Sequence, residues 1–95
     1  MYVGMYRMTE KGAADMKKGP ERMKDAMKAW EAMGGTTKVA LATMGKYDYI
    51  SVGEAPSDEV AAAFAAALSS QGFVTTETLR GFTPEEFSDL LAKLP

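Results

Sequence analysis

Tyr47 and Asp48 are neighbours in the chain and could cooperate in proton transfer. A carboxylate can act as a general base or anchor a ligand, and a phenol can donate a hydrogen bond to a substrate oxygen. The pair also has a structural interpretation, because aspartate commonly accepts hydrogen bonds from nearby backbone in turns, while tyrosine can pack in an interface. The residue types favour the structural interpretation and leave the catalytic one open.

Glu77 and Arg80 carry opposite charges three residues apart in a segment with strand character. Residues three apart in a strand project to opposite faces, so these two are not expected to pair with each other. A buried acid with a raised pKa would be a functional candidate, whereas an ion pair between strands or subunits would fix their register. The second interpretation is favoured. Other possible partners in the chain are Glu54, Asp48, Arg7 and Arg22.

The sequence therefore offers a small set of candidate ligand-binding residues. An arginine could hold an anionic group, and threonines could line a polar pocket, although threonine is also an ordinary strand residue. The set is Arg22, Tyr47, Asp48, Glu54, Thr76, Glu77 and Arg80, and the catalytic candidates within it are Asp48, Tyr47 and Glu77.

Histidine and cysteine are both missing from the 95 residues. Their absence excludes a histidine-ligated haem, a Ser-His-Asp triad, a thiolate metal site and any disulfide. The eight methionines could bind Cu(I), but Met23 and Met27 share one helical stripe with Trp30, which indicates core packing. No phosphate-binding glycine motif occurs. We expect no metal and no cofactor.

The formal net charge is −2, which argues against nucleic acid as the main partner. Lysines between Lys11 and Lys28 alternate with acidic residues, a pattern typical of a solvated helix face. No apolar run approaches the roughly 20 residues that span a bilayer, and no signal peptide is recognisable. We expect a cytoplasmic protein with no membrane partner.

The elements that must position these residues can be read from turn and capping signals. Strands are predicted over residues 1–8, 38–44, 47–54 and 73–81, with a tight turn at Gly45-Lys46. Helices are predicted over residues 9–18, 20–33, 57–71 and from Thr83 onwards, where Thr83 and Glu86 form a capping box. This order predicts one α+β domain over residues 1–95, a ferredoxin-like β-α-β-β-α-β fold with a four-stranded antiparallel sheet and an added C-terminal helix.

The sheet is expected to have a second face that is not plainly polar. Both sides of the first and third predicted strands carry apolar or aromatic residues, whereas a sheet with one wet face should alternate cleanly. Such a patch usually marks an interface, and a two-fold homodimer or higher oligomer would bury it. The interface candidates are Tyr2, Tyr6, Tyr47 and Tyr49.

The chain also resembles the GYD domain family. Gly45-Lys46-Tyr47-Asp48 matches its Gly-x-Tyr-Asp signature, and further matches follow in order along nearly the whole chain: Pro20-Glu21-Arg22, Gly34-Gly35, Glu54-Ala55-Pro56, Thr76-Glu77-Thr78-Leu79-Arg80 and Phe82-Thr83. The resemblance implies a ferredoxin-like subunit of the dimeric α/β barrel type and implies no particular activity. Gly81 departs from the pattern, where alanine is more usual.

Three functions are compatible with these residues. A non-catalytic oligomeric subunit that binds a ligand or serves in assembly is favoured. A small cofactor-independent enzyme, monooxygenase-like or isomerase-like, would use Asp48 or Glu77 as base and Tyr47 as acid, with Arg80 or Arg22 holding an anionic substrate. A regulatory or nucleic-acid-binding role comes last. An enzyme should bring a carboxylate, a tyrosine and an arginine together at one cavity.

Overall fold

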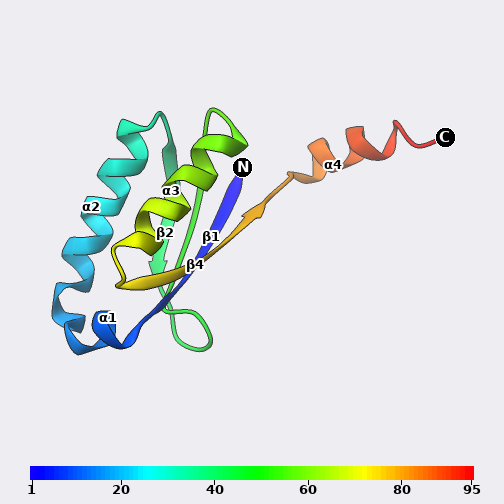
Figure 1. Cartoon of the computed structure of the whole chain (residues 1–95). Coiled ribbons are helices and arrows are strands. Elements are labelled where there is room, and N and C mark those ends of the chain that lie inside the picture. Colours follow the sequence, from blue (N-terminus) through cyan, green and yellow to red (C-terminus); the bar gives the residue numbers. More distant parts are fainter.

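The computed structural model describes residues 1–95, which have an α+β fold (Figure 1). The elements in chain order are β1 (Tyr2–Met8), α1 (Glu10–Ala14), a 3₁₀ turn (Met16–Lys18), α2 (Gly19–Ala32), β2 (Thr36–Ala42), β3 (Tyr49–Glu54), α3 (Asp58–Ser70), β4 (Val74–Arg80) and α4 (Pro84–Leu91).

The four strands form one antiparallel sheet in the order β2-β3-β1-β4. Helices α2 and α3 cover one face of this sheet, and α4 extends away from the end of β4 without covering either face (Figure 1). The ferredoxin-like topology predicted from the sequence is therefore confirmed, and the C-terminal helix is an addition to it. None of the helices has the length and apolar character needed to cross a membrane.

The connection between β2 and β3 is longer than the predicted two-residue turn. Residues 43–48 form a loop that is closed by a backbone hydrogen bond from Thr43 to the carbonyl of Asp48 (2.8 Å). The Thr43 hydroxyl also donates to the carbonyl of Tyr47 (2.6 Å). Tyr47 and Asp48 therefore belong to the loop, and β3 begins at Tyr49 rather than at Tyr47.

The helix starts follow the capping signals of the sequence. Ser57 accepts the backbone N–H of Val60 at the start of α3, and Thr83 and Glu86 form both hydrogen bonds of the capping box at α4. Thr9 caps α1, but the helix predicted over residues 9–18 ends at Ala14 and is followed by a separate 3₁₀ turn. Each cap satisfies a backbone N–H that has no partner within its helix.

The core is small and is centred on Trp30. Its indole Nε1 donates to the carbonyl of Thr36 (3.0 Å), and its ring meets Phe64 edge-on at 4.9 Å between centroids. Gly53 lies so close that a Cβ atom there would stand 2.2 Å from the Thr36 carbonyl oxygen. Only eight of the 95 residues are buried. Ten large hydrophobic side chains remain exposed, so the chain keeps much of its apolar surface in contact with water.

The outer strand β2 contains a bulge. Its pairing with β3 shifts between Thr37 and Val39, which leaves Lys38 without a direct partner on β3. A bulge inserts one extra residue into a strand and increases its local twist. Beyond it, Val39 and Leu41 pair with Val52 and Ile50, and these four side chains share one face.

Candidate functional site

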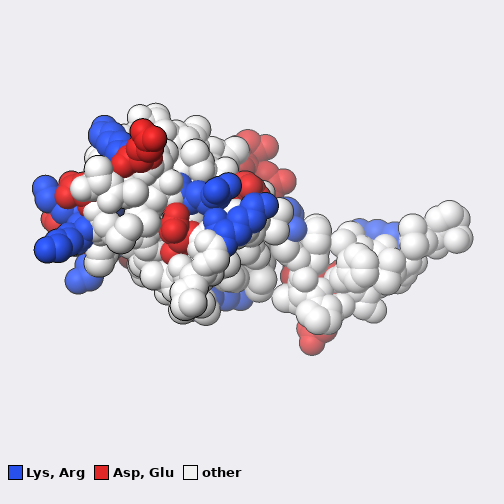
Figure 2. Space-filling view, turned by 90° about the horizontal axis from the view of Figure 1, so that it is seen from below, with Lys and Arg blue, Asp and Glu red and all other residues white.

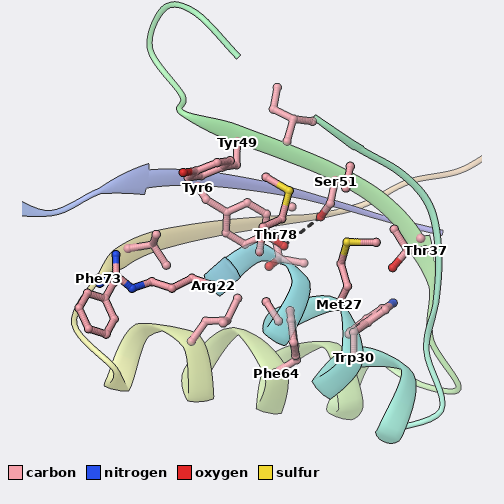
Figure 3. Close-up of a pocket in the computed structure, with 18 of the residues that line it drawn as sticks. Tyr6, Arg22, Met27, Trp30, Thr37, Tyr49, Ser51, Phe64, Phe73 and Thr78 are labelled. Atoms are coloured by element: carbon pink, nitrogen blue, oxygen red, sulfur yellow. Dashed lines mark hydrogen bonds between the residues drawn. The ribbon is translucent and has the colours of Figure 1, made fainter. Parts of the chain in front are cut away.

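A cavity of about 140 Å³ lies between the sheet and the helices α2 and α3 (Figure 3). Its walls are mostly apolar, with Met27 and Trp30 from α2 and Phe64 from α3 facing the sheet. An apolar pocket with a few polar groups is the usual form of a small-molecule site.

The polar groups in this cavity come mainly from the strands. Tyr6 and Ser51 are joined by a hydrogen bond of 3.0 Å between their hydroxyl oxygens (Figure 3). Burial raises the pKa of Tyr6, and its hydrogen bond to Ser51 partly opposes that effect. The phenol is therefore neutral at physiological pH and serves as a hydrogen-bonding group. Tyr49, Thr37 and Thr78 also line the cavity.

Arg22 reaches one end of the cavity from α2. Its guanidinium lies over the ring of Phe73, 3.8 Å from the ring centroid, and forms an ion pair with Asp15 at 2.9 Å. Arg22 is one of the residues that the sequence suggested for ligand binding, and it is the only one of that set in the cavity wall.

Tyr47 and Glu77 meet outside the cavity. The Tyr47 hydroxyl donates to the Glu77 carboxylate at 3.0 Å, in an exposed position. Glu77 pairs with Met5 across the β1–β4 ladder and therefore projects to the face that the helices leave open. Glu77 and Arg80 project to opposite faces, as their spacing predicted.

Asp48 is held by backbone contacts. Its carboxylate accepts the N–H of Met8 at 2.7 Å, and its own N–H donates to the carbonyl of Tyr6 at 2.8 Å. Asp48 therefore fastens the 43–48 loop to the end of β1. This arrangement corresponds to the structural interpretation of the residue.

The remaining candidates are spread over the molecule. Arg80 lies 3.5 Å from the Asp58 carboxylate, and Thr76 shares a hydrogen bond of 3.2 Å with Ser69. Glu54 pairs with the N-terminal ammonium at 3.1 Å, and this hydrogen bond is the main reason why the pKa of Glu54 is lowered. The carboxylates, tyrosine and arginines proposed for catalysis therefore do not converge on one cavity.

The open face of the sheet is largely apolar, and sequence reasoning missed most of its residues. The pairing registers place seven apolar side chains on it, Val3, Met5, Val39, Leu41, Ile50, Val52 and Leu79, together with the polar residues Arg7, Thr36, Glu54, Thr75 and Glu77. Leu41 and Leu79 remain about half exposed, at 53% and 51%. The alternation in Val39-Ala40-Leu41-Ala42 was the available signal, because it separates large apolar from small side chains.

The predicted interface tyrosines lie elsewhere, with one exception. Tyr2, Tyr6 and Tyr49 share the helix-covered face, where they line the cavity. Tyr2 is buried, and its hydroxyl donates to Asp58, which is the main cause of its raised pKa. The expectation that these three tyrosines form the second face therefore needs correction. Tyr47 alone reaches the open face, through Glu77.

On the face drawn in Figure 2, charges of both signs are interspersed over the body of the molecule, and the segment with α4 stands apart and shows few charged atoms. Interspersed charges of both signs are typical of a solvated surface.

Comparisons with known proteins point to one family. A family model described as GYD domain matches residues 2–91. A protein of Thermus thermophilus named glutamine synthetase and cystathionine beta-lyase binding protein is 33% identical over 94 residues, which cover 98% of this chain and 96% of that protein. No solved structure gives a significant match.

Proposed function

The chain belongs to the GYD domain family, and from this premise we propose that it is a non-catalytic binding protein that works as a homo-oligomer assembled through its open sheet face. The observation that carries the proposal is the row of apolar side chains on that face, which no element of the chain covers.

Exposure of this face is unfavourable for a free subunit. Burying apolar surface contributes about 25 cal/mol per Å², and an uncovered patch of several large side chains usually marks an interface. Two identical faces can meet about a two-fold axis. Each contact between two residues is then formed twice, once from each copy. Sheets packed in this way lie about 10 Å apart, with their side chains interdigitated.

The binding role is supported by two further observations. The relative from Thermus thermophilus is named for its binding of two enzymes, and it matches this chain over almost its full length. In addition, Asp48, Tyr47 and Glu77 are engaged in contacts within the fold and lie outside the cavity. We propose that this chain likewise binds a metabolic enzyme of that class.

The cavity between the sheet and the helices is suited to bind a small ligand. Its volume is close to that of engineered cavities of about 150 Å³ that bind benzene, so it fits a small apolar group. Arg22 at one end would favour a molecule that also carries an anionic group. The alternative of a cofactor-independent enzyme would need a base inside this cavity, and the candidate carboxylates lie elsewhere.

Self-association is tested by sedimentation equilibrium on the full chain and on Leu41→Glu. We expect the unmodified chain to be a dimer or larger oligomer and the variant to associate at least tenfold more weakly, because the new carboxylate must be desolvated in the interface. Ala63→Glu is the control, because Ala63 is exposed on α3 away from the sheet. A monomeric unmodified chain would refute the proposed assembly.

Partner binding is tested with purified glutamine synthetase and purified cystathionine beta-lyase from the organism that supplies this chain. Each enzyme is titrated against labelled chain in a fluorescence anisotropy experiment, with an unrelated enzyme of similar size as control. Saturable binding of either enzyme supports the proposal. If the anisotropy changes with neither enzyme, the proposed class of partner is contradicted. The self-association result is unaffected by that outcome.

A further inference from the structure

Helix α4 is built as a stable helix but packs against nothing in its own chain. Within residues 83–94, all hydrogen bonds are made between members of the segment itself. An isolated helix of eight residues is marginal in water, because helix formation has a costly nucleus and helices shorter than about 12–15 residues rarely persist alone. The capping box lowers that cost without removing it. A stable α4 therefore needs a packing surface that its own chain does not provide.

The side chains of this segment indicate what kind of surface is missing. Large apolar residues recur at spacings of three and four, which places them on one side of the helix. They remain exposed by 40–67%, and with the residue that precedes the helix they make up half of the ten exposed large hydrophobic residues of the chain. They are Phe82, Phe87, Leu90, Leu91 and Leu94.

The chain directs this segment away from its own body. The N–H of Gly81 donates to the carbonyl of Met1 (2.7 Å), and the guanidinium of Arg80 donates to the carbonyl of Gly81 (3.0 Å). These bonds hold the exit from β4, and α4 then continues outward from the end of the sheet (Figure 1). The segment also stands clear of the body in the perpendicular view (Figure 2).

We propose that α4 is an arm that packs its apolar side against a second copy of this chain. The inference rests on the proposed assembly through the open sheet face and specifies a second part of that interface.

The size of the sheet face supports a contribution from the arm. Four strands about 4.8 Å apart, each of six or seven residues at about 3.3 Å, give a flat face of about 400 Å². A standard interface takes about 800 Å² from each partner, so the sheet alone covers roughly half of that area in projection. An arm that leaves from the edge of the same face is placed to extend the contact beyond it.

The charge distribution fixes how the arm would lie. Glu85 and Asp89 are on the side of α4 opposite the leucines, and burial of those carboxylates would be unfavourable without cationic partners. Only the apolar side can therefore be covered, and the acidic side stays in water.

Hydrogen exchange on the full-length chain tests the arm directly. We expect backbone amides of residues 87–91 to be protected at least tenfold more at concentrations where the chain is associated than after dilution to monomer. An associated chain with unprotected α4 amides would overturn the arm and leave the sheet interface standing. A chain that never associates would overturn both.

A pair of neighbouring substitutions gives the matched test. Leu91→Lys places a charge on the apolar side of the arm, and Ala92→Lys places the same charge on the opposite side. We expect Leu91→Lys to raise the dissociation constant of the oligomer at least tenfold and Ala92→Lys to leave it within twofold. Equal effects of the two variants would refute the arm. A shift that appears only when a purified partner enzyme is added would assign α4 to that partner and refute packing on a second copy.

Discussion

At the scale of single residues, the Tyr6–Ser51 hydrogen bond is the polar contact that best defines the cavity, because it spans neighbouring strands beneath the helices. Both hydroxyl groups are partly buried, and without this bond each would need a water molecule as its hydrogen-bond partner. Loss of one partner leaves the other without its hydrogen bond, which is the costly situation for a buried polar group.

We predict that Tyr6→Phe and Ser51→Ala each lower the free energy of unfolding by about 1 kcal/mol, the usual net value of one hydrogen bond. The double variant should cost less than the sum, because the two residues share one interaction. Urea unfolding at a single protein concentration measures this. Strictly additive effects would mean that the two hydroxyls act independently.

Two glycines allow a second comparison at this scale. A Cβ atom at Gly53 would stand 2.2 Å from the Thr36 carbonyl oxygen and 3.2 Å from Trp30 Nε1, whereas at Gly81 the nearest atom would be 3.6 Å away. We predict that Gly53→Ala lowers the free energy of unfolding by at least about 2 kcal/mol, because backbone must move. Gly81→Ala should change the free energy of unfolding by no more than about 0.5 kcal/mol, because a Cβ atom there meets only ordinary van der Waals contacts. Thermal unfolding of both variants checks this, and a tolerated Gly53→Ala would contradict the close approach.

At the scale of elements, the start of α4 depends on an ionised carboxylate. Glu86 accepts the backbone N–H of Thr83, and this hydrogen bond is the main reason why its pKa is lowered. A carboxyl group whose pKa is lower in the folded state stabilises that state above its unfolded pKa of about 4.3. The contribution is lost as the pH falls through the lower, folded value.

We therefore predict that the helical NMR shifts of residues 84–91 weaken at acid pH below the ordinary range of glutamate, because protonation of Glu86 removes the carboxylate that accepts the Thr83 N–H. In Glu86→Gln this pH dependence should be reduced, because the neutral amide does not titrate. Glu85→Gln is the control, since it leaves both hydrogen bonds of the capping box in place. An unchanged pH response in Glu86→Gln would show that another group governs the helix end.

The elements were predictable because the sequence marks their ends. Ser57 and Thr83 cap helices, and glycine with positive φ follows the helices at Gly34 and Gly72. The orientation of the strands about their own axes was not predictable in the same way. In β1 both alternating sets carry large side chains, so the pattern does not say which set faces the helices, and Tyr2 and Tyr6 lie on the face opposite to the predicted one.

The candidate site was less predictable for a related reason. Arg22 reaches the cavity because α2 crosses the sheet where Phe73 provides a ring for its guanidinium, a contact between residues far apart in the sequence. The pairing of Tyr47 with Glu77 likewise depends on the path of the 43–48 loop. Local sequence patterns contain no information on such long-range contacts. The projection of Glu77 and Arg80 to opposite faces, in contrast, followed from their spacing alone.

At the scale of the whole molecule, stability should depend on protein concentration. If unfolding separates an oligomer into free chains, a tenfold rise in concentration stabilises a dimer by about 1.4 kcal/mol. We predict that the Tm rises with concentration for the unmodified chain and is lower at each concentration for Leu41→Glu, whose open face carries a charge. Differential scanning calorimetry over a hundredfold range of concentration measures this. A constant Tm for the unmodified chain would contradict assembly.

The bulge at Lys38 limits how far the sheet can grow. β2 is an outer strand, and an outer strand presents unpaired backbone groups that can recruit a strand from another molecule and start aggregation. The irregular pairing between Thr37 and Val39 interrupts that edge, and the lysine at the interruption is held 3.5 Å from Glu54. A charged bulge of this kind is a common defence of exposed strand edges. The apolar face can thus meet its counterpart while the edge beside it resists uncontrolled strand addition.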